Sequence, residues 1–165
     1  MKILFLTVVL IFSGCAMTPP VPQMSQLEIR EMQTRSYENG GVSFKQVMKA
    51  IINVLQDDGF IIKNADKELG FITAVQETDV ETPWGSAFAI GFGDQQPRYP
   101  KNAINEGSVN ITERGKRMQV RAIFQKKVLD NLGGTSSVHQ ITNLEYYQKF
   151  FSKVDKGLFL EKQGY

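Results

Sequence analysis

The sequence predicts an α+β domain in which two amphipathic helices cover one face of an antiparallel sheet. Two separated segments repeat apolar residues every three or four positions, and each begins behind a capping residue. Between them lie runs rich in β-branched and aromatic residues, joined by tight turns that favour antiparallel pairing. The expected order is β-α-β-β-(loop)-β-β-(β)-α. A chain of 165 residues is long enough for one domain with its own core.

The first helix has both a start and a stop signal. Residues 32–37 are expected to form a strand, and the turn at residues 39–41 leads into the helix. Ser43 is a favourable N-cap, and Gln46 three residues later completes a capping box. Gly59 is expected to end the helix as a C-cap glycine. One face of the helix is apolar and consists of Phe44, Val47, Met48, Ile51, Val54 and Leu55.

Two pairs of strands are expected around tight turns. The first pair is residues 60–63 and 71–75, and the second is residues 108–112 and 118–129. In the last segment apolar and polar residues nearly alternate, as in a half-buried strand. A glycine-rich break then leads to a further strand at residues 138–141.

The second helix closes the predicted domain. Thr142 and Glu145 are expected to form its capping box, and Gly157 to end it. Residues 158–160 are expected to pack back on the domain. Its apolar face is expected to consist of Tyr146, Phe150, Phe151 and Val154. The aromatic cluster Tyr146-Tyr147 and Phe150-Phe151 is interpreted as core rather than as a binding site.

Residues 78–107 are predicted to form a long irregular loop, because they contain three prolines, several glycines and the single tryptophan. Trp84, Phe88, Ile90 and Phe92 are spaced by two or four positions among small residues. That spacing places all four on one side of an extended segment. The hypothesis is that they contact a partner protein or the membrane surface, and the alternative is a strand or hairpin that packs on the domain.

The N-terminal residues 1–14 have the order of a secretory signal peptide. Lys2 supplies a positive charge, an apolar run of about ten residues follows, and Ser13 and Gly14 are small. The apolar run is too short to span a bilayer, which needs roughly 20 residues.

Cys15 is the single cysteine of the chain and directly follows these small residues. The sequence Phe12-Ser13-Gly14-Cys15 resembles the bacterial lipobox, in which the cysteine thiolate takes up a diacylglyceryl group. Two or three acyl chains on Cys15 would hold the protein stably on a membrane, whereas one chain holds only marginally. Residues 15–28 are expected to form a proline-rich tether. The single periplasmic domain is expected at residues 29–165.

Ala16, and not Asp, follows Cys15. By resemblance to the sorting rule of enteric bacteria, this favours the outer membrane over the inner membrane.

Several stretches of the domain resemble a group of uncharacterised Gram-negative lipoproteins. The matching stretches are LQDDGFII at residues 55–62, DKELGFITA at 66–74, VRAIFQ at 120–125, YQKFF at 147–151 and FLE at 159–161. The order helix–Gly–strand–turn–Gly–strand is also distantly similar to the helix-grip domains of the BamC outer-membrane assembly lipoprotein. The first resemblance implies a cell-envelope protein, and the second is architectural and implies little about function.

Composition narrows the function further. The charge is nearly balanced, with 19 Lys and Arg against 17 Asp and Glu, which does not favour nucleic-acid binding. His139 is the single histidine and is expected at the surface, so we expect no metal site and no Ser-His-Asp triad. Neither catalytic residues nor a cofactor are expected.

Three classes of function remain open. The favoured one is a non-enzymatic lipoprotein that binds another envelope protein as an assembly or accessory subunit. The second is a module that binds a small ligand or a lipid in a cavity between helix and sheet. The third is an enzyme with an unfamiliar site. Inner or outer membrane, partner and oligomeric state are left open by the sequence.

Overall fold

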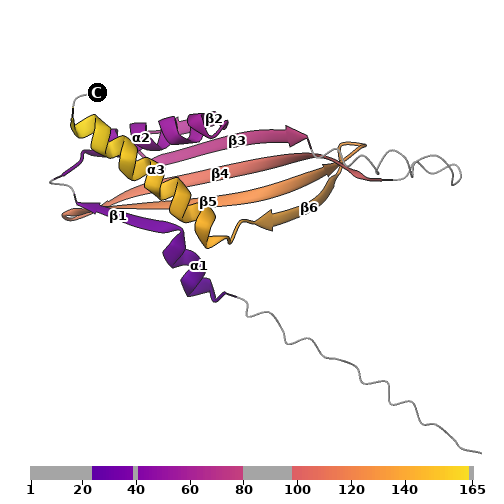
Figure 1. The fold of residues 1–165 in the computed structure, drawn as a ribbon, viewed down its shortest axis with the longest axis horizontal. Coiled ribbons are helices and arrows are strands. Elements are labelled where there is room, and N and C mark those ends of the chain that lie inside the picture. Colours follow the sequence, from indigo (N-terminus) through magenta and orange to yellow (C-terminus); the bar gives the residue numbers. More distant parts are fainter. Residues whose placement is uncertain (1–23, 39–40, 80–97, 164–165) are drawn as a thin grey trace, which may run out of the picture.

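A computed structural model describes residues 24–38, 41–79 and 98–163. Within these residues the chain forms three helices and six strands (Figure 1). In chain order they are α1 (Gln26–Met32), β1 (Thr34–Glu38), α2 (Phe44–Asp57), β2 (Ile61–Asp66), β3 (Phe71–Asp79), β4 (Pro100–Arg114), β5 (Arg117–Asp130), β6 (Thr135–Gln140) and α3 (Leu144–Lys162).

All strand pairs are antiparallel, and the sheet has the order β1-β5-β4-β3-β2. The strand β6 also pairs with β5. Because β1 pairs with residues 117–121 of β5 and β6 with residues 125–129, these two short strands share one edge of β5. The predicted α+β class and its antiparallel sheet are confirmed.

The helices α2 and α3 lie on the same side of the sheet (Figure 1). Alternate residues of β5 point to that side and are buried, namely Met118, Val120, Ala122 and Phe124. The Phe124 ring is central, with ring contacts at 5.1–5.9 Å between centroids. The interpretation of the aromatic cluster on the second helix as core is confirmed, because Tyr147, Phe150 and Phe151 are all buried there.

Local sequence explains where α2 and the β2–β3 turn begin and end. The Ser43 side chain accepts a hydrogen bond from the Gln46 amide at 3.3 Å, and Gln46 Oε1 accepts one from the Ser43 amide at 2.8 Å. This is the capping box that the sequence predicts. Gly70 ends the turn before β3 with φ of 65°, and a Cβ there would lie 2.2 Å from the Ile111 carbonyl oxygen. Glycine is therefore required at this position.

The tether predicted at residues 15–28 is too long at its C-terminal end. Helix α1 begins at Gln26, and Ser25 and Glu28 form its capping box. This helix buries none of its residues, and Leu27 is 66% exposed. Without an apolar stripe it has no periodic signal, so local capping was the sole indication of it.

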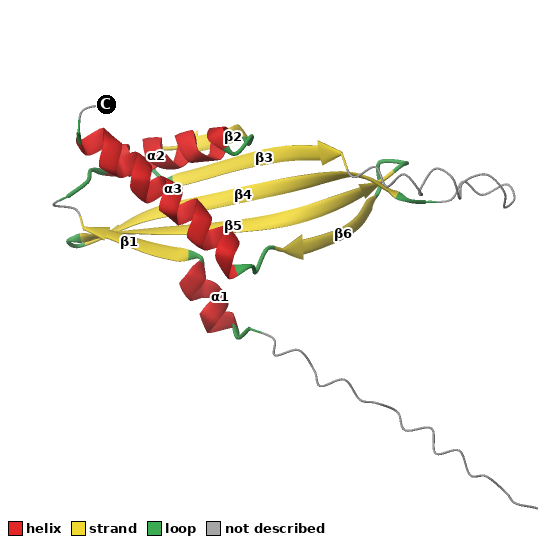
Figure 2. Ribbon diagram, viewed as in Figure 1, coloured by secondary structure: helices red, strands yellow, loops and turns green. Residues whose placement is uncertain are grey.

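The irregular loop predicted at residues 78–107 is wrong at both ends. Strand β3 continues to Asp79, and β4 begins at Pro100 (Figure 2). Proline is tolerated as the first residue of a strand, and the following residues of β4 pair with strands on both sides. Trp84, Phe88, Ile90 and Phe92 lie outside the described residues, as does Cys15.

The predicted limits of the second helix also need correction. Asn143 is the N-cap of α3, with its side chain accepting from the Tyr146 amide at 2.9 Å, so Thr142 and Glu145 form no capping box. The helix continues past Gly157 to Lys162. A Cβ on Gly157 would lie 3.6 Å from the Cβ of Ala50 in α2, so this glycine permits close helix packing rather than ending a helix.

The buried face of α2 generates a stability prediction. Ile51 is fully buried and Lys45 is exposed. Replacing Ile51 with Ala should lower the free energy of unfolding by about 2–5 kcal/mol, because both transfer and packing energy are lost. The matched change Lys45→Ala should cost less than about 0.5 kcal/mol. Urea unfolding of both variants checks this, and equal midpoints would contradict the assigned helix face.

Candidate functional site

The face of the sheet opposite α2 and α3 carries no helix among the described residues (Figure 1). Its side chains alternate along each strand with those of the core and are half-buried or exposed. They form three rows across β3, β4 and β5. We call these nine residues the open face: Val75, Glu106 and Gln125; Thr73, Ser108 and Ile123; and Phe71, Asn110 and Arg121.

A shallow depression of about 340 Å³ lies on the open face. Glu106 accepts a hydrogen bond from the Gln125 side chain across the β4–β5 pair. Val75 and Ile123 contribute apolar surface, and Lys63 of β2 lies at its border. The depression thus combines a few apolar contacts with hydroxyl and amide groups that donate and accept hydrogen bonds. Such a lining suits contact with a protein surface.

A second hollow lies between the helices α2 and α3. It has a volume of about 500 Å³. Ala50, Val54, Gly157 and Leu160 supply its apolar lining, and the charged lining consists of Asp57, Lys153, Lys156 and Glu161. Two ion pairs connect the helices near this groove. Lys49 contacts Glu161 at 2.6 Å, and Lys153 contacts Asp58.

A buried polar cluster joins α1, β5 and α3. The Tyr147 hydroxyl accepts a hydrogen bond from the Phe124 amide at 3.2 Å and donates one to the Ile141 carbonyl at 3.0 Å. The Gln33 side chain, which is 1% exposed, donates to the same hydroxyl at 3.4 Å. Burial raises the pKa of Tyr147. The hydroxyl is therefore neutral at physiological pH, and its partners assign it a structural role.

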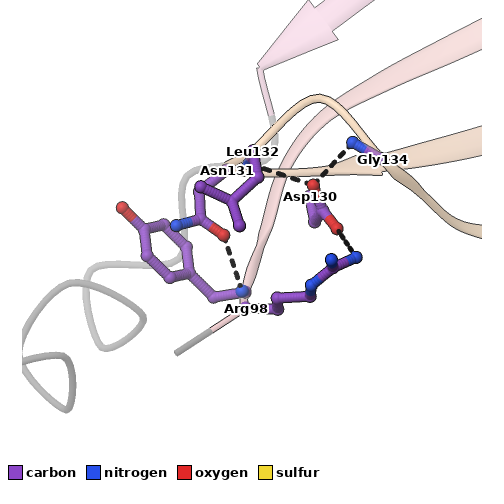
Figure 3. Close-up of polar contacts among 6 residues, drawn as sticks. Arg98, Asp130, Asn131, Leu132 and Gly134 are labelled. Atoms are coloured by element: carbon purple, nitrogen blue, oxygen red, sulfur yellow. Dashed lines mark hydrogen bonds and ion pairs between the residues drawn. The ribbon is translucent and has the colours of Figure 1, made fainter. Parts of the chain in front are cut away.

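Asp130 organises the turn between β5 and β6 (Figure 3). Its carboxylate accepts hydrogen bonds from the backbone amides of Gly134 at 2.7 Å and Leu132 at 3.0 Å. The Arg98 guanidinium contacts the other carboxylate oxygen at 3.1 Å. These interactions, with the Gly134 amide first, lower the pKa of Asp130. The neighbouring Asn131 accepts from the Tyr99 amide at 3.2 Å, so the turn also fixes the chain that enters β4.

Burial raises the pKa of two further tyrosines. Tyr146 is raised to about 12, mainly by desolvation beside Phe124. Desolvation also raises the pKa of Tyr37, and its hydroxyl contacts Asp155 at 2.9 Å. Both rings pack against the core, and each also lines a hollow, of about 380 Å³ at Tyr37 and about 200 Å³ at Tyr146.

His139, one of the residues considered from the sequence, lies exposed on β6. Gln33 and Asp130 were not predicted as structurally important. For Asp130 a local signal exists, because aspartate followed by Asn-Leu-Gly-Gly is typical of a side chain that binds turn amides. Gln33 has no such signal, since its partners are 88 and 114 residues away in the chain.

The described residues hold neither a cluster of metal-ligating side chains nor a helix that could span a membrane. Within residues 24–38, 41–79 and 98–163, no group of three or more His, Cys, Asp or Glu side chains could hold a metal ion. None of the helices described there is long and apolar enough to cross a membrane.

Comparison with known proteins identifies no family. No family model matches the chain, and no curated protein matches it. Among solved structures, it is similar to a DUF4468 family protein from Bacteroides ovatus, with 9% sequence identity and a TM-score of 0.42. The match covers 76% of this chain and 84% of the other. At that level the similarity supports no statement about function.

The Asp130 turn generates a pH prediction. Since the folded pKa of Asp130 is lowered, its stabilisation is complete above the unfolded pKa of about 3.9 and is lost as the pH falls through the folded value. Replacing Asp130 with Asn should therefore lower the melting temperature at pH 6 more than at pH 3. Thermal unfolding at both values checks this, with Asp57→Asn as the exposed control. An equal loss at both pH values would contradict the role given to the carboxylate.

Proposed function

We propose that the protein is a lipid-anchored lipoprotein of the cell envelope whose domain binds another envelope protein without catalysing a reaction. In this proposal it serves as an assembly or accessory subunit. The observation that carries the proposal is the asymmetry of the sheet. One face carries the buried core, whereas the open face presents a regular surface of hydroxyl, amide, charged and apolar groups. That the two amphipathic helices cover one face of the sheet, as the sequence predicts, is part of the proposal.

The anchor part of the proposal rests on the sequence. The signal-peptide order of residues 1–14 and the small residues before Cys15 support cleavage and acylation at that cysteine. Ala16 supports sorting to the outer membrane, with the domain facing the periplasm. Such a protein binds the membrane through its acyl chains and needs no spanning helix.

The alternative proposal is an envelope lipoprotein that binds a small ligand or a lipid between helix and sheet. Side chains fill much of that space, because Phe124 of β5 contacts the rings of Tyr146 and Phe150 of α3 at 5.1 Å. A ligand would have to displace these ring contacts. The hollows of about 340 and 500 Å³ lie instead on the open face and between α2 and α3, and the one beside Phe60, Gln76 and Tyr146 is smaller, at about 200 Å³. This arrangement favours the protein-binding proposal.

Residues 84–93 are proposed to add to the binding surface. Trp84, Phe88, Ile90 and Phe92 belong to the chain between β3 and β4. Those two strands both contribute to the open face. A partner bound to the open face would therefore lie close to where this segment leaves β3 and returns to β4.

Anchoring is tested by the change Cys15→Ser. Without the thiol no diacylglyceryl group can be attached, so the variant should leave the membrane fraction or accumulate as an uncleaved precursor. Membrane fractionation with mass measurement of the mature chain checks this. Unchanged fractionation together with an unchanged mass would contradict the lipoprotein proposal.

Partner binding is tested by the change Ile123→Arg at the centre of the open face. A charged side chain there should weaken association by about tenfold or more, because contacts at the centre of an interface carry most of the binding energy. The measurement is the amount of each envelope protein that co-purifies with the tagged full chain from detergent-solubilised membranes.

The control for this experiment is Val138→Arg. Val138 is 51% exposed on β6, where it pairs with Lys127; it lies on the same side of the sheet but is not one of the nine residues of the open face. Both variants should keep the circular dichroism spectrum of the wild type. If the Ile123→Arg and Val138→Arg proteins each co-purify the same envelope proteins in the same amounts as the wild type, the open face is not the binding surface.

A further inference from the structure

The outward side of α3 carries a line of lysines that ends in two exposed apolar residues. A helix advances about 100° per residue, so positions 149, 153, 156 and 160 fall on one side and position 159 lies beside them. Phe159 is 58% exposed and Leu160 is 42% exposed. We call this set the outer stripe: Lys149, Lys153, Lys156, Phe159 and Leu160.

Most acidic side chains near the outer stripe already have cationic or hydroxyl partners. Glu161 contacts Lys49, Asp58 contacts Lys153, and Asp155 accepts from the Tyr37 hydroxyl and contacts Arg35. Among the described residues, Lys149 and Lys156 are left exposed without an ion pair.

Two further acidic residues, Glu145 and Asp57, are exposed at its margins. The middle of the stripe therefore presents positive charge to whatever lies against it.

The groove between α2 and α3 adds a place for a phosphate-bearing group. Lys156 and Leu160 of the stripe both line this groove of about 500 Å³, together with Ala50 and Gly157. The carboxylates of Asp57 and Glu161 line it as well, and that of Glu161 is paired with Lys49. A cationic side chain thus stands next to apolar surface at the same hollow. This pairing suits a phospholipid, whose phosphate is anionic and whose glycerol and acyl carbons are apolar.

The length of chain before the described residues limits how far the domain can lie from its anchor. Met24 lies nine positions after Cys15, which gives a reach of at most about 32 Å. Helix α3 is itself about 29 Å long. Because α1 lies beside the N-terminal end of α3, an acylated Cys15 would keep the outer stripe within reach of the bilayer (Figure 1). Such tethering gives a high effective concentration of lipid at the stripe.

We propose that the outer stripe rests on an anionic phospholipid surface when the protein is anchored. The lysines pair with lipid phosphates, and Phe159 and Leu160 enter the headgroup region, as in interfacial helices. The inference rests on the proposed lipid anchor and adds an orientation to it. With α3 on the bilayer, the open face on the other side of the sheet points away from the membrane and toward periplasmic partners.

The test depends on Cys15 being the single cysteine of the natural sequence. In the mature acylated protein Cys15 cannot react with a thiol reagent, so Leu160→Cys provides a unique attachment site for the polarity-sensitive dye nitrobenzoxadiazole. Leu69→Cys is the matched control, because Leu69 is 72% exposed in the β2–β3 turn, outside the outer stripe. Each labelled protein is reconstituted into phosphatidylcholine vesicles with and without phosphatidylglycerol, and its fluorescence is recorded.

The expected result is a blue shift and an intensity rise of about threefold or more at position 160 in the anionic vesicles, with little change at position 69. Adding Lys149→Gln and Lys156→Gln should remove most of the rise, since these substitutions delete charge from exposed positions without touching the core. Equal fluorescence changes at positions 160 and 69 would overturn the inference. So would a rise at position 160 that is the same without phosphatidylglycerol and without the two lysines.

Two other outcomes are also decisive. A probe at position 160 that changes in native membranes but not in lipid vesicles would show that the stripe contacts a protein, and would overturn the lipid assignment. Doubly labelled protein that stays off the vesicles would show that Cys15 is not acylated, and would overturn the proposed anchor together with the orientation. Failure of the inference alone keeps the protein singly labelled and bound to the vesicles.

Discussion

The hydroxyl of Tyr147 links α3 to the backbone of β5 at an edge of the sheet where no strand pairs with it. The strands β1 and β6 share one edge of β5 and leave a gap opposite residues 122–124. Backbone groups in this gap are buried, and an unpaired group there costs about 1–3 kcal/mol. The Ala122 amide donates a hydrogen bond to the Gln33 carbonyl at 2.9 Å, and the Phe124 amide donates one to the Tyr147 hydroxyl. A side chain from a helix thus replaces a strand residue, which fixes α3 over the sheet.

This join divides the molecule into two sides with different chemistry. On the helical side Tyr147, Phe150 and Phe151 of α3 are buried in the core, and α3 presents its outward line of lysines with Phe159 and Leu160 to its surroundings. On the other side the half-buried hydroxyl and amide groups of β3, β4 and β5 have no helix against them within the described residues. The proposals for a lipid surface and for a protein partner therefore concern opposite sides of one sheet and do not compete for the same residues.

Much of the fold could be predicted from the sequence because its signals are local. The capping box of Ser43 and Gln46 and the alternation in β5 depend on neighbours a few positions away. Signals with two physical meanings gave errors. Gly157 fits a helix end as well as a close helix contact, and its contact with Ala50 decides between them only in three dimensions. The prolines of residues 78–107 favour a loop, although one of them, Pro100, is the first residue of the paired strand β4. Gln33 depends on residues far along the chain and could not be found from spacing. The candidate open face was likewise invisible, since it depends on the pairing register of three strands.

The most direct measurement is hydrogen exchange at the Phe124 amide in the variant Tyr147→Phe. This change keeps the buried ring and removes the hydroxyl, so the Phe124 amide and the Ile141 carbonyl lose their shared partner. We expect the Phe124 amide to exchange much faster than in the wild type. The Val120 amide lies where β5 pairs with both β1 and β4, and its exchange rate should change only as much as the change in global stability requires. Protection of Phe124 equal to that in the wild type, at equal global stability, would show that Tyr147 does not join the sheet to α3.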